Sequence, residues 1–326
     1  MPHRPLPPRN KLNIVFAHGA YQMAARFAAR DTGIAHCQAW SLDEFKATLP
    51  TADVVSVSMM WKNELIEQAP RLVFIQSISA GLDQYDRAKL QAAGIRLAGG
   101  AGVNARAVAE HAIALMLALK RHLHTGRDNQ VARHWRGMIS NPAEREDELG
   151  GKTVLVVGLG RIGARFVQLA KAFDLHVIGV RRDPSKGAAG ADEVHAAGRL
   201  ADLAPRADFV VLTSALTPET EGLVSAAVIA RMRPSATLIN VSRGRVVDEA
   251  ALIAALTEKR IAAAGLDVTR VEPLPGASPL WTTPNVLITP HTAGETQAYE
   301  DNVIDILLEN LERQWRGEQE LVNGVV

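Results

Sequence analysis

Three ionisable residues, Arg243, Glu272 and His291, each lie just after a short apolar segment in the second half of the chain. An arginine holds a carboxylate through its planar fork. A histidine can supply a proton near neutral pH, and a neighbouring carboxylate can orient the imidazole and keep it protonated. Reduction of a 2-oxo acid needs an anchor for the substrate carboxylate, a proton donor for the emerging alkoxide and a source of hydride. The three residues therefore predict this reaction, with no metal required.

The segment "VLVVGLGRIG" (155–164) predicts the hydride carrier. Gly158, Gly160 and Gly163 have the G-x-G-x-x-G spacing, follow an apolar run and open a helical pattern. In that context the first glycine permits a tight turn, the second lets the backbone approach a pyrophosphate, and the third lets the helix pack close to the strand. We expect a nicotinamide dinucleotide here; the alternative is an ordinary turn between a strand and a helix.

The segment "VIGVRRDPSKG" (177–187) bears on which nucleotide binds. About 20 residues after the glycine motif, an acidic residue usually holds the ribose hydroxyl of NAD. This chain has Arg181 and Arg182 there, and a guanidinium can grip the 2′-phosphate of NADP instead. The pair predicts NADP in preference to NAD. Asp183 is the adjacent residue that would favour NAD, and arginines in a loop can also be solvated charge.

Two series of apolar runs alternate with helical patterns and predict two parallel α/β sheets. The first series spans residues 13–99 and the second spans residues 153–290. A long helix is expected from about Asn104 to Arg121, followed by a polar excursion over residues 125–150. A last helix, from about Glu295 to Trp315, belongs to neither series by order. We expect it to pack back on the first domain, which makes that domain discontinuous.

Composition narrows the class of protein. The 326 residues suffice for two hydrophobic cores, and a net charge of +1 argues against a nucleic-acid binder. Cys37 is the single cysteine, which excludes an internal disulfide and a cysteine-rich metal site. No apolar run reaches the roughly 18 residues that a membrane span needs. Residues 1–13 are basic and proline-rich without an apolar core, so we expect a short disordered lead-in and a cytoplasmic protein.

These motifs resemble the D-2-hydroxyacid dehydrogenase family, in particular its glyoxylate and hydroxypyruvate reductases. The resemblance covers nearly the whole chain after residue 50. The segments that carry it are "SAGLDQYD" (79–86), "VNARAVAEHAIALMLAL" (103–119), "GLGRIG" (158–163), "LTPETEGLV" (216–224), "NVSRGRVVDEAAL" (240–252), "AGLDVTRVEPLP" (264–275) and "SPLWTTPNVLITPHTAG" (278–294). The resemblance implies two Rossmann-like or flavodoxin-like α/β domains. A discontinuous substrate domain would comprise residues 1–102 and 292–326, and a dinucleotide-binding domain residues 103–291.

The resemblance also implies site residues, with Arg243, Glu272 and His291 as the catalytic set. Asp267 would lie near the nicotinamide carboxamide, and Ala215 stands near the cofactor where the family usually has proline. Together with the motif and the arginine pair, the expected cofactor contacts are Gly158, Gly160, Arg161, Ile162, Gly163, Arg181, Arg182, Ala215, Val241, Ser242, Asp267 and Gly294. The expected substrate contacts are Met60, Ala80, Gly81, Arg243 and His291. Met59, Met60 and Trp61 either line an apolar pocket wall or belong to the core.

Family members are typically dimers joined through the cofactor domain, so we expect a homodimer. Trp135 then either reaches the partner's active site or packs in the interface. Proteins with this fold have three other functions to consider. Glu272 argues against a formate dehydrogenase, whose histidine has a glutamine partner. A phosphoglycerate dehydrogenase without its regulatory domain and a nucleotide-sensing binding protein related to transcriptional corepressors remain alternatives.

Overall fold

The computed structural model describes residues 4–326, and the chain divides into two compact units. Unit 1 comprises Met1–Asn104 and Thr296–Val326, and unit 2 comprises Ala105–Glu295. The prediction of two parallel α/β domains, one of them discontinuous, is confirmed. The sequence placed the second boundary after residue 291. The contacts place it after residue 295, so the whole turn that carries His291 stays in unit 2.

Unit 1 is built on a five-stranded parallel sheet with the order β2-β1-β3-β4-β5, which is the flavodoxin-like order. Its strands are β1 (Asn13–Ala17), β2 (Ala35–Ala39), β3 (Val54–Val57), β4 (Phe74–Ser77) and β5 (Arg96–Ala98). Its helices are α1 (Met23–Ala28), α2 (Leu42–Thr48), α3 (Arg87–Ala92) and α10 (Tyr299–Trp315). One apolar cluster joins α1 and α10 to one face of the sheet, and a second joins α2 and α3 to the other face.

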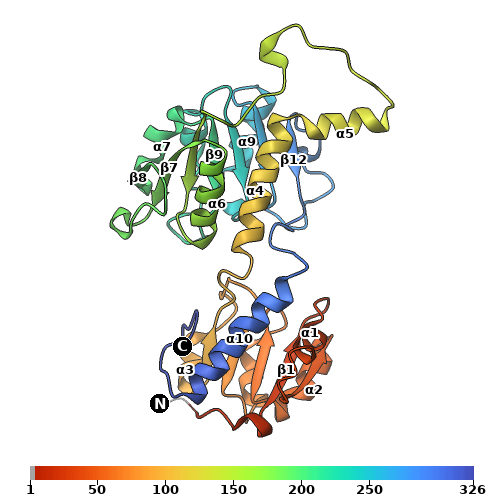
Figure 1. Cartoon of the computed structure of the whole chain (residues 1–326), viewed down its shortest axis with the longest axis vertical. Coiled ribbons are helices and arrows are strands. Elements are labelled where there is room, and N and C mark those ends of the chain that lie inside the picture. Colours follow the sequence, from red (N-terminus) through yellow and green to blue (C-terminus); the bar gives the residue numbers. More distant parts are fainter. Residues whose placement is uncertain (1–3) are drawn as a thin grey trace. The chain divides into compact units, whose positions relative to one another are not determined.

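Helix α10 packs on unit 1, as its place in the chain predicted (Figure 1). Val303, Ile304 and Leu307 are fully buried in the cluster that also contains α1. The buried Asn310 donates a hydrogen bond from Nδ2 to Oε1 of Gln76 on β4, at 3.0 Å. Apolar burial and a satisfied polar contact therefore both fix the return of the chain to unit 1.

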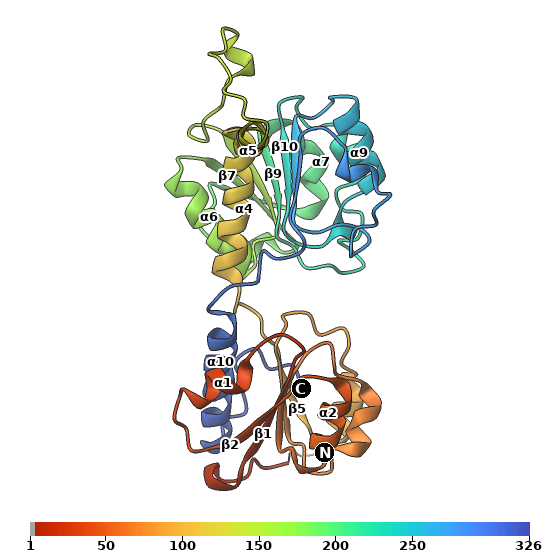
Figure 2. The same cartoon turned by 90° about the vertical axis from the view of Figure 1, so that its right-hand side faces the viewer.

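Unit 2 is built on a seven-stranded parallel sheet with the order β12-β11-β10-β9-β6-β7-β8. Its strands are β6 (Thr153–Val157), β7 (His176–Arg181), β8 (Glu193–Ala196), β9 (Phe209–Leu212), β10 (Thr237–Asn240), β11 (Ala263–Leu266) and β12 (Val286–Ile288). Its helices are α4 (Ala105–Lys120), α5 (Leu123–Val131), α6 (Arg161–Ala172), α7 (Leu200–Leu203), α8 (Ala226–Ile229) and α9 (Glu249–Thr257). Helices α4 and α6 cover one face, and α7 and α9 cover the other (Figure 2).

Strand β6 shows why the apolar runs of unit 2 are continuous. Val154 and Val156 face the cluster under α4 and α6, while Leu155 and Val157 face the cluster under α7 and α9. A strand covered on both faces has no polar side, as is usual in parallel sheets. The strand order reverses between β6 and β9, and ligands of such sheets bind at this point, outside the carboxyl ends of the strands.

Strand β8 and helix α5 are elements that the sequence analysis did not predict. The segment "EVHA" has no apolar run, so periodicity gave no signal for β8. Polar contacts support β8 instead. Arg206, His195 and His176 all hydrogen-bond to Glu193, and they lower the pKa of its carboxyl to about 2. Helix α5 lies at the start of the polar excursion and has no buried residue.

The expectation of a disordered lead-in is wrong for residues 4–12, and its first three residues lie outside the described part of the chain. Arg4 donates a hydrogen bond to the carbonyl of Pro70 at 2.9 Å. Trp315 donates from Nε1 to the carbonyl of Pro7 at 2.8 Å, and the guanidinium of Arg9 lies over the Trp315 ring. Helix α10 and the loop before β4 thus supply the contacts that the segment cannot make by itself. Between residues 4 and 326 no helix combines the length and the apolar character of a membrane span.

Candidate active site

Glu272 and His291 form a direct pair at the carboxyl edge of the unit 2 sheet. They follow the neighbouring strands β11 and β12, and Nδ1 of His291 lies 2.6 Å from Oε2 of Glu272. The other carboxylate oxygen, Oε1, accepts a hydrogen bond from the backbone N–H of Thr269 at 3.0 Å. The side chains stay 45% and 36% exposed. Since Nδ1 is engaged by Glu272, Nε2 is the nitrogen of His291 that can serve a substrate.

The turn that carries His291 is organised around Asp267, which is only 2% exposed. Oδ1 of Asp267 accepts hydrogen bonds from Thr289 Oγ1 at 2.6 Å and from the Thr292 N–H at 3.0 Å. Both carboxylate oxygens also lie within 3.2 Å of the Ala293 N–H. The N–H of His291 donates to the Asp267 carbonyl at 2.8 Å. His291 has φ +56°, in the left-handed region where few non-glycine residues lie. Asp267, predicted as a cofactor contact, therefore also holds the backbone of this turn.

Arg243 follows β10 in a turn that Asn240 organises. Oδ1 of Asn240 accepts hydrogen bonds from the N–H and the Oγ of Ser242, and its Nδ2 donates to the Arg243 carbonyl at 3.1 Å. Nη1 of Arg243 donates to the Ser242 carbonyl at 2.7 Å. Asn240 is buried, and the sequence analysis did not single it out as a site residue. A buried amide at the end of an otherwise apolar strand is the signal that could have identified it.

Gly244 allows the turn after β10 to touch the turn after β11. A Cβ at this position would lie 2.0 Å from the carbonyl carbon and oxygen of Thr269, so only glycine fits. The backbone segments that carry Arg243 and Glu272 are therefore in direct contact. Within residues 4–326, however, no hydrogen bond or ion pair joins the Arg243 side chain to Glu272 or His291.

The glycine motif has the geometry that a dinucleotide requires. Gly158 has φ +108°, and a Cβ there would lie 2.6 Å from the Ser214 nitrogen. A Cβ on Gly163 would lie 1.9 Å from the Gly158 carbonyl oxygen, so α6 packs against the loop only through a glycine. A Cβ on Gly160 would meet no atom within 4 Å, so the protein leaves open space at this position. Gly160 is the N-cap of α6, whose first turn has no acidic residue. The loop thus fits a dinucleotide pyrophosphate.

The arginine pair lies at the end of β7, as predicted. Nη1 of Arg181 donates to the carbonyls of Lys186 and Gly187, at 3.1 and 2.7 Å. Arg182 lies 3.5 Å from Glu219 and is largely exposed. Asp183 caps the turn that follows, and hydrogen bonds from the Ser185 hydroxyl and N–H lower the pKa of its carboxyl. Both bonds go to Oδ1, so Oδ2 of Asp183 keeps lone pairs that could accept from a ribose hydroxyl, and the NAD alternative stands beside the arginine pair.

The remaining expected cofactor residues lie in unit 2. Val241 and Ser242 are buried, and the buried Oγ of Ser214 has no hydrogen-bond partner in the described chain. The Ala215 carbonyl accepts a hydrogen bond from Thr220 Oγ1 at 2.7 Å. Arg161 and Ile162 begin α6, and Gly294 follows the turn around Asp267. An orphaned hydroxyl beside the glycine loop is a group that a bound ligand would satisfy.

The expected substrate residues of unit 1 lie in loops after β3 and β4. Met60 is partly buried and packs on the cluster under α2 and α3, while Ala80 and Gly81 lie in the loop after β4. Trp61 is 2% exposed and belongs to the core, whereas Met59 is 80% exposed. The structure thus separates the three bulky residues: Trp61 packs inside, and Met59 is available at the surface.

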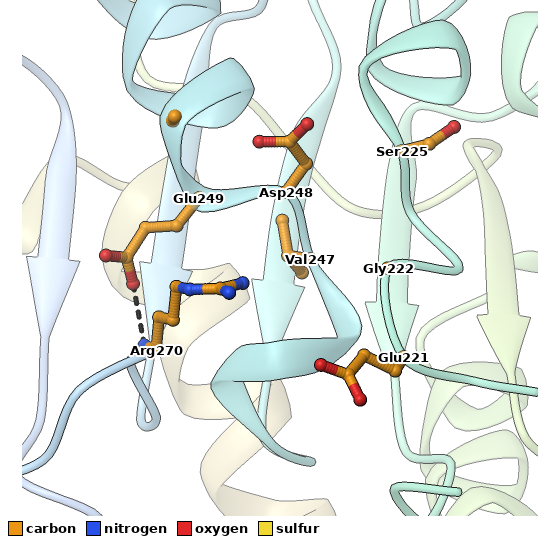
Figure 3. A pocket seen from close by; sticks show the side chains of 8 residues that line it. Glu221, Gly222, Ser225, Val247, Asp248, Glu249 and Arg270 are labelled. Atoms are coloured by element: carbon orange, nitrogen blue, oxygen red, sulfur yellow. Dashed lines mark hydrogen bonds between the residues drawn. The ribbon is translucent and has the colours of Figure 1, made fainter. Parts of the chain in front are cut away.

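A cavity of about 410 Å³ also lies at the carboxyl edge of the unit 2 sheet (Figure 3). Its lining includes three acidic residues, and each has a role in the fold. Asp248 caps α9, Glu221 pairs with Arg245, and Glu249 accepts a hydrogen bond from the Arg270 N–H at 2.7 Å. None of the predicted site residues lines this cavity. With three acidic residues and one arginine, this lining does not suit a carboxylate substrate. We therefore place the candidate site at Arg243, Glu272 and His291.

A parallel sheet with a glycine-rich loop at its switch point, and a histidine–carboxylate pair beside an arginine, define a class of dinucleotide-dependent oxidoreductases. Comparison with known proteins specifies that class. The family described as D-isomer specific 2-hydroxyacid dehydrogenase, NAD binding domain, matches residues 113–293. The chain belongs to this family and is a nicotinamide-dependent dehydrogenase by that membership.

Individual relatives agree with this assignment. The glyoxylate reductase of Pyrococcus furiosus is 34% identical over 269 residues, which is 81% of this chain and 79% of that protein. The D-3-phosphoglycerate dehydrogenase of Methanocaldococcus jannaschii is 34% identical over 278 residues, 85% of this chain but 52% of that protein. This chain thus spans about half the length of that relative. The structure of a D-isomer specific 2-hydroxyacid dehydrogenase family protein from Aeromonas salmonicida has a TM-score of 0.84 and 26% identity, covering 97% of this chain and 99% of its own.

Proposed function

We propose that this protein reduces a small 2-oxo acid, such as glyoxylate or hydroxypyruvate, to the D-2-hydroxy acid with NAD(P)H. The observation that carries the proposal is the contact of 2.6 Å between Glu272 and His291, in a turn next to the one that carries Arg243. A nicotinamide dinucleotide, when bound, supplies the hydride. The family assignment supports the reaction class, and the glyoxylate reductase relative supports a small substrate.

The residues have distinct roles in this proposal. Arg243 anchors the substrate carboxylate through its guanidinium, and Nε2 of His291 gives a proton to the oxygen that becomes the hydroxyl. Glu272 holds Nδ1 of His291, which fixes the orientation of the ring and leaves Nε2 to face the substrate. The open space at Gly160, with the start of α6, holds the pyrophosphate.

The direct test is a matrix of NADPH and NADH against glyoxylate, hydroxypyruvate, an aromatic pyruvate and 3-phosphohydroxypyruvate. We expect turnover of about 1 per second or more with at least one unphosphorylated acid, and a D product by chiral chromatography. Turnover confined to 3-phosphohydroxypyruvate would favour the phosphoglycerate dehydrogenase alternative. Tight nucleotide binding without oxidation of the cofactor would favour a sensor and overturn the proposal.

The loop glycines give a matched pair of variants. We expect Gly163→Ala to lower the free energy of unfolding by about 1–3 kcal/mol or more, because its methyl group meets backbone. Gly160→Ala should cost less than about 1 kcal/mol, since its Cβ meets no protein atom. The methyl group added by Gly160→Ala would instead occupy the space in which we place the pyrophosphate. Urea unfolding and cofactor titration by NAD(P)H fluorescence separate the two effects. Unchanged cofactor affinity in Gly160→Ala would contradict the proposed site.

We further propose that the cofactor is NADP rather than NAD. Arg181 and Arg182 at the end of β7 support the preference, since guanidinium groups bind a phosphate dianion well. In the double variant Arg181→Gln/Arg182→Gln, kcat/KM for NADPH should fall about 10- to 100-fold, while that for NADH changes less than about threefold. Arg199→Gln is the control, since Arg199 forms an exposed ion pair with Asp202. An equal response of the two cofactors would show that the arginines do not read the 2′-phosphate.

We also propose a homodimer formed through α5 and the segment that follows it. The segment carries large apolar side chains on its surface, including Trp135 at 97% exposure and Met138 at 100%. Several exposed large apolar side chains within one segment are typical of interaction surfaces. The double variant Trp135→Ala/Met138→Ala should raise the dimer dissociation constant at least about tenfold in sedimentation equilibrium. Trp135→Ala with an intact dimer and lower kcat/KM would place Trp135 in the partner's active site. A monomeric parent protein would refute the proposal.

A further inference from the structure

His111 belongs to the hydrogen-bond network of the catalytic turn although it lies 178 positions before Thr289. It projects from α4, and its Nε2 lies 2.9 Å from Oγ1 of Thr289 and 3.6 Å from Oδ1 of Asp267. The Thr289 hydroxyl lies 2.6 Å from the same Oδ1. A continuous path therefore runs from His111 through Thr289 to Asp267, whose carboxylate holds the turn with His291.

The chemistry of the groups fixes the direction of each hydrogen bond. A carboxylate only accepts, and Asp267 also accepts from the backbone N–H groups of Thr292 and Ala293. Thr289 must therefore donate its one hydroxyl hydrogen to Asp267. The contact between Thr289 and His111 then requires Nε2 of His111 to donate, so the proton of a neutral His111 lies on Nε2.

We propose that His111 and Thr289 are positioning residues that hold His291 in place through Asp267. The proposal rests on the proposed function, since it assigns roles around His291 as proton donor. His291 has left-handed φ, which a non-glycine residue keeps only where its surroundings enforce it. The network supplies this constraint. His111 and Thr289 fix the Asp267 carboxylate, the carboxylate fixes the Thr292 and Ala293 backbone, and the imidazole then meets Glu272.

A pair of variants at each position tests the hydrogen bonds rather than the volume. Thr289→Val removes the hydroxyl with little change of shape, and Thr289→Ser keeps the hydroxyl. His111→Met removes the donor, and His111→Gln places an amide N–H near the position of Nε2. We expect kcat to fall about 10- to 100-fold in Thr289→Val and His111→Met, because a small misplacement of a catalytic group is costly. The conservative variants should stay within about threefold of the parent.

Two readouts separate positioning from general support of the fold. The KM of the 2-oxo acid should change less than about threefold in every variant, since Arg243 anchors the substrate carboxylate in this scheme and the network does not include Arg243. The kcat of the double variant His111→Met/Thr289→Val should be no lower than that of the less active single variant, because both substitutions act through one path.

A measurement on the unaltered protein needs no variant to fold. Nitrogen-15 NMR of the histidine rings in the parent protein should show a proton on Nε2 of His111. A second comparison uses the variants, in which the His291 signals should shift in Thr289→Val but not in Thr289→Ser. An Nε2 of His111 that carries no proton, or parent-like kcat in Thr289→Val, would overturn the inference and leave the proposed function intact. If the parent protein reduces no 2-oxo acid, the proposed function fails, and the NMR result alone decides whether the network holds His291.

Discussion

Replacement of His291 by asparagine is expected to lower kcat for reduction of the 2-oxo acid by about 10³-fold, within the range that general acid catalysis contributes. Asparagine is the suitable replacement because it tolerates the left-handed backbone of position 291. The fold of the turn is then kept, and the proton donor is lost. Steady-state kinetics at saturating cofactor measure the effect, and the substrate KM should change little because Arg243 still anchors the carboxylate.

His176→Gln is a closely matched control. His176 is also 45% exposed and also hydrogen-bonds to a glutamate, with Nε2 3.0 Å from Oε1 of Glu193. It begins β7 and therefore lies at the opposite edge of the sheet from the candidate site. We expect parent-like kinetics from His176→Gln. If His291→Asn retained more than about a tenth of the parent kcat, His291 could not be the proton donor of the reaction.

Replacement of Arg243 by alanine is expected to lower kcat/KM for the 2-oxo acid by about 10²- to 10³-fold. The reason is the loss of a two-pronged, charge-assisted contact with the substrate carboxylate. Arg243→Lys keeps the charge but not the fork, so it should recover only part of the loss. The affinity for NADPH, titrated without substrate, should stay within about threefold of the parent.

Arg245→Gln is the control for Arg243, two residues away on the same turn. Arg245 pairs with Glu221 at 2.8 Å, so its charge is engaged by the protein itself. We expect parent-like kcat/KM in Arg245→Gln, and partial rescue of Arg243→Ala by guanidinium ion in the assay. An Arg243→Ala variant that lost cofactor affinity and kept its relative rates among 2-oxo acids would assign Arg243 to the cofactor instead of the substrate.

Much of the fold followed from the order and period of the apolar runs. The runs of 13–99 and 153–290 correspond to the two parallel sheets, because a strand buried on both faces must be apolar throughout. The return of α10 to unit 1 followed from its place after a completed series. Strand β8 and the packing of residues 4–12 could not be predicted from the apolar runs, since both depend on contacts with residues outside the segment itself. Arg206 supports the first, and Trp315 supports the second.

The sequence by itself determined the kinds of chemistry available. The chain has residues that can anchor a carboxylate, donate a proton and accommodate a pyrophosphate, and each lies just after an apolar run. Because the carboxyl ends of parallel strands share one edge of the sheet, these residues are expected at that edge. The tertiary structure decided which of these residues meet. Glu272 contacts His291 because β11 and β12 are neighbours in the sheet, whereas the Arg243 side chain has no direct contact with either. It also placed His111 of α4 beside Thr289. Residues so far apart in the chain become partners only when strand order and helix packing close the space between them.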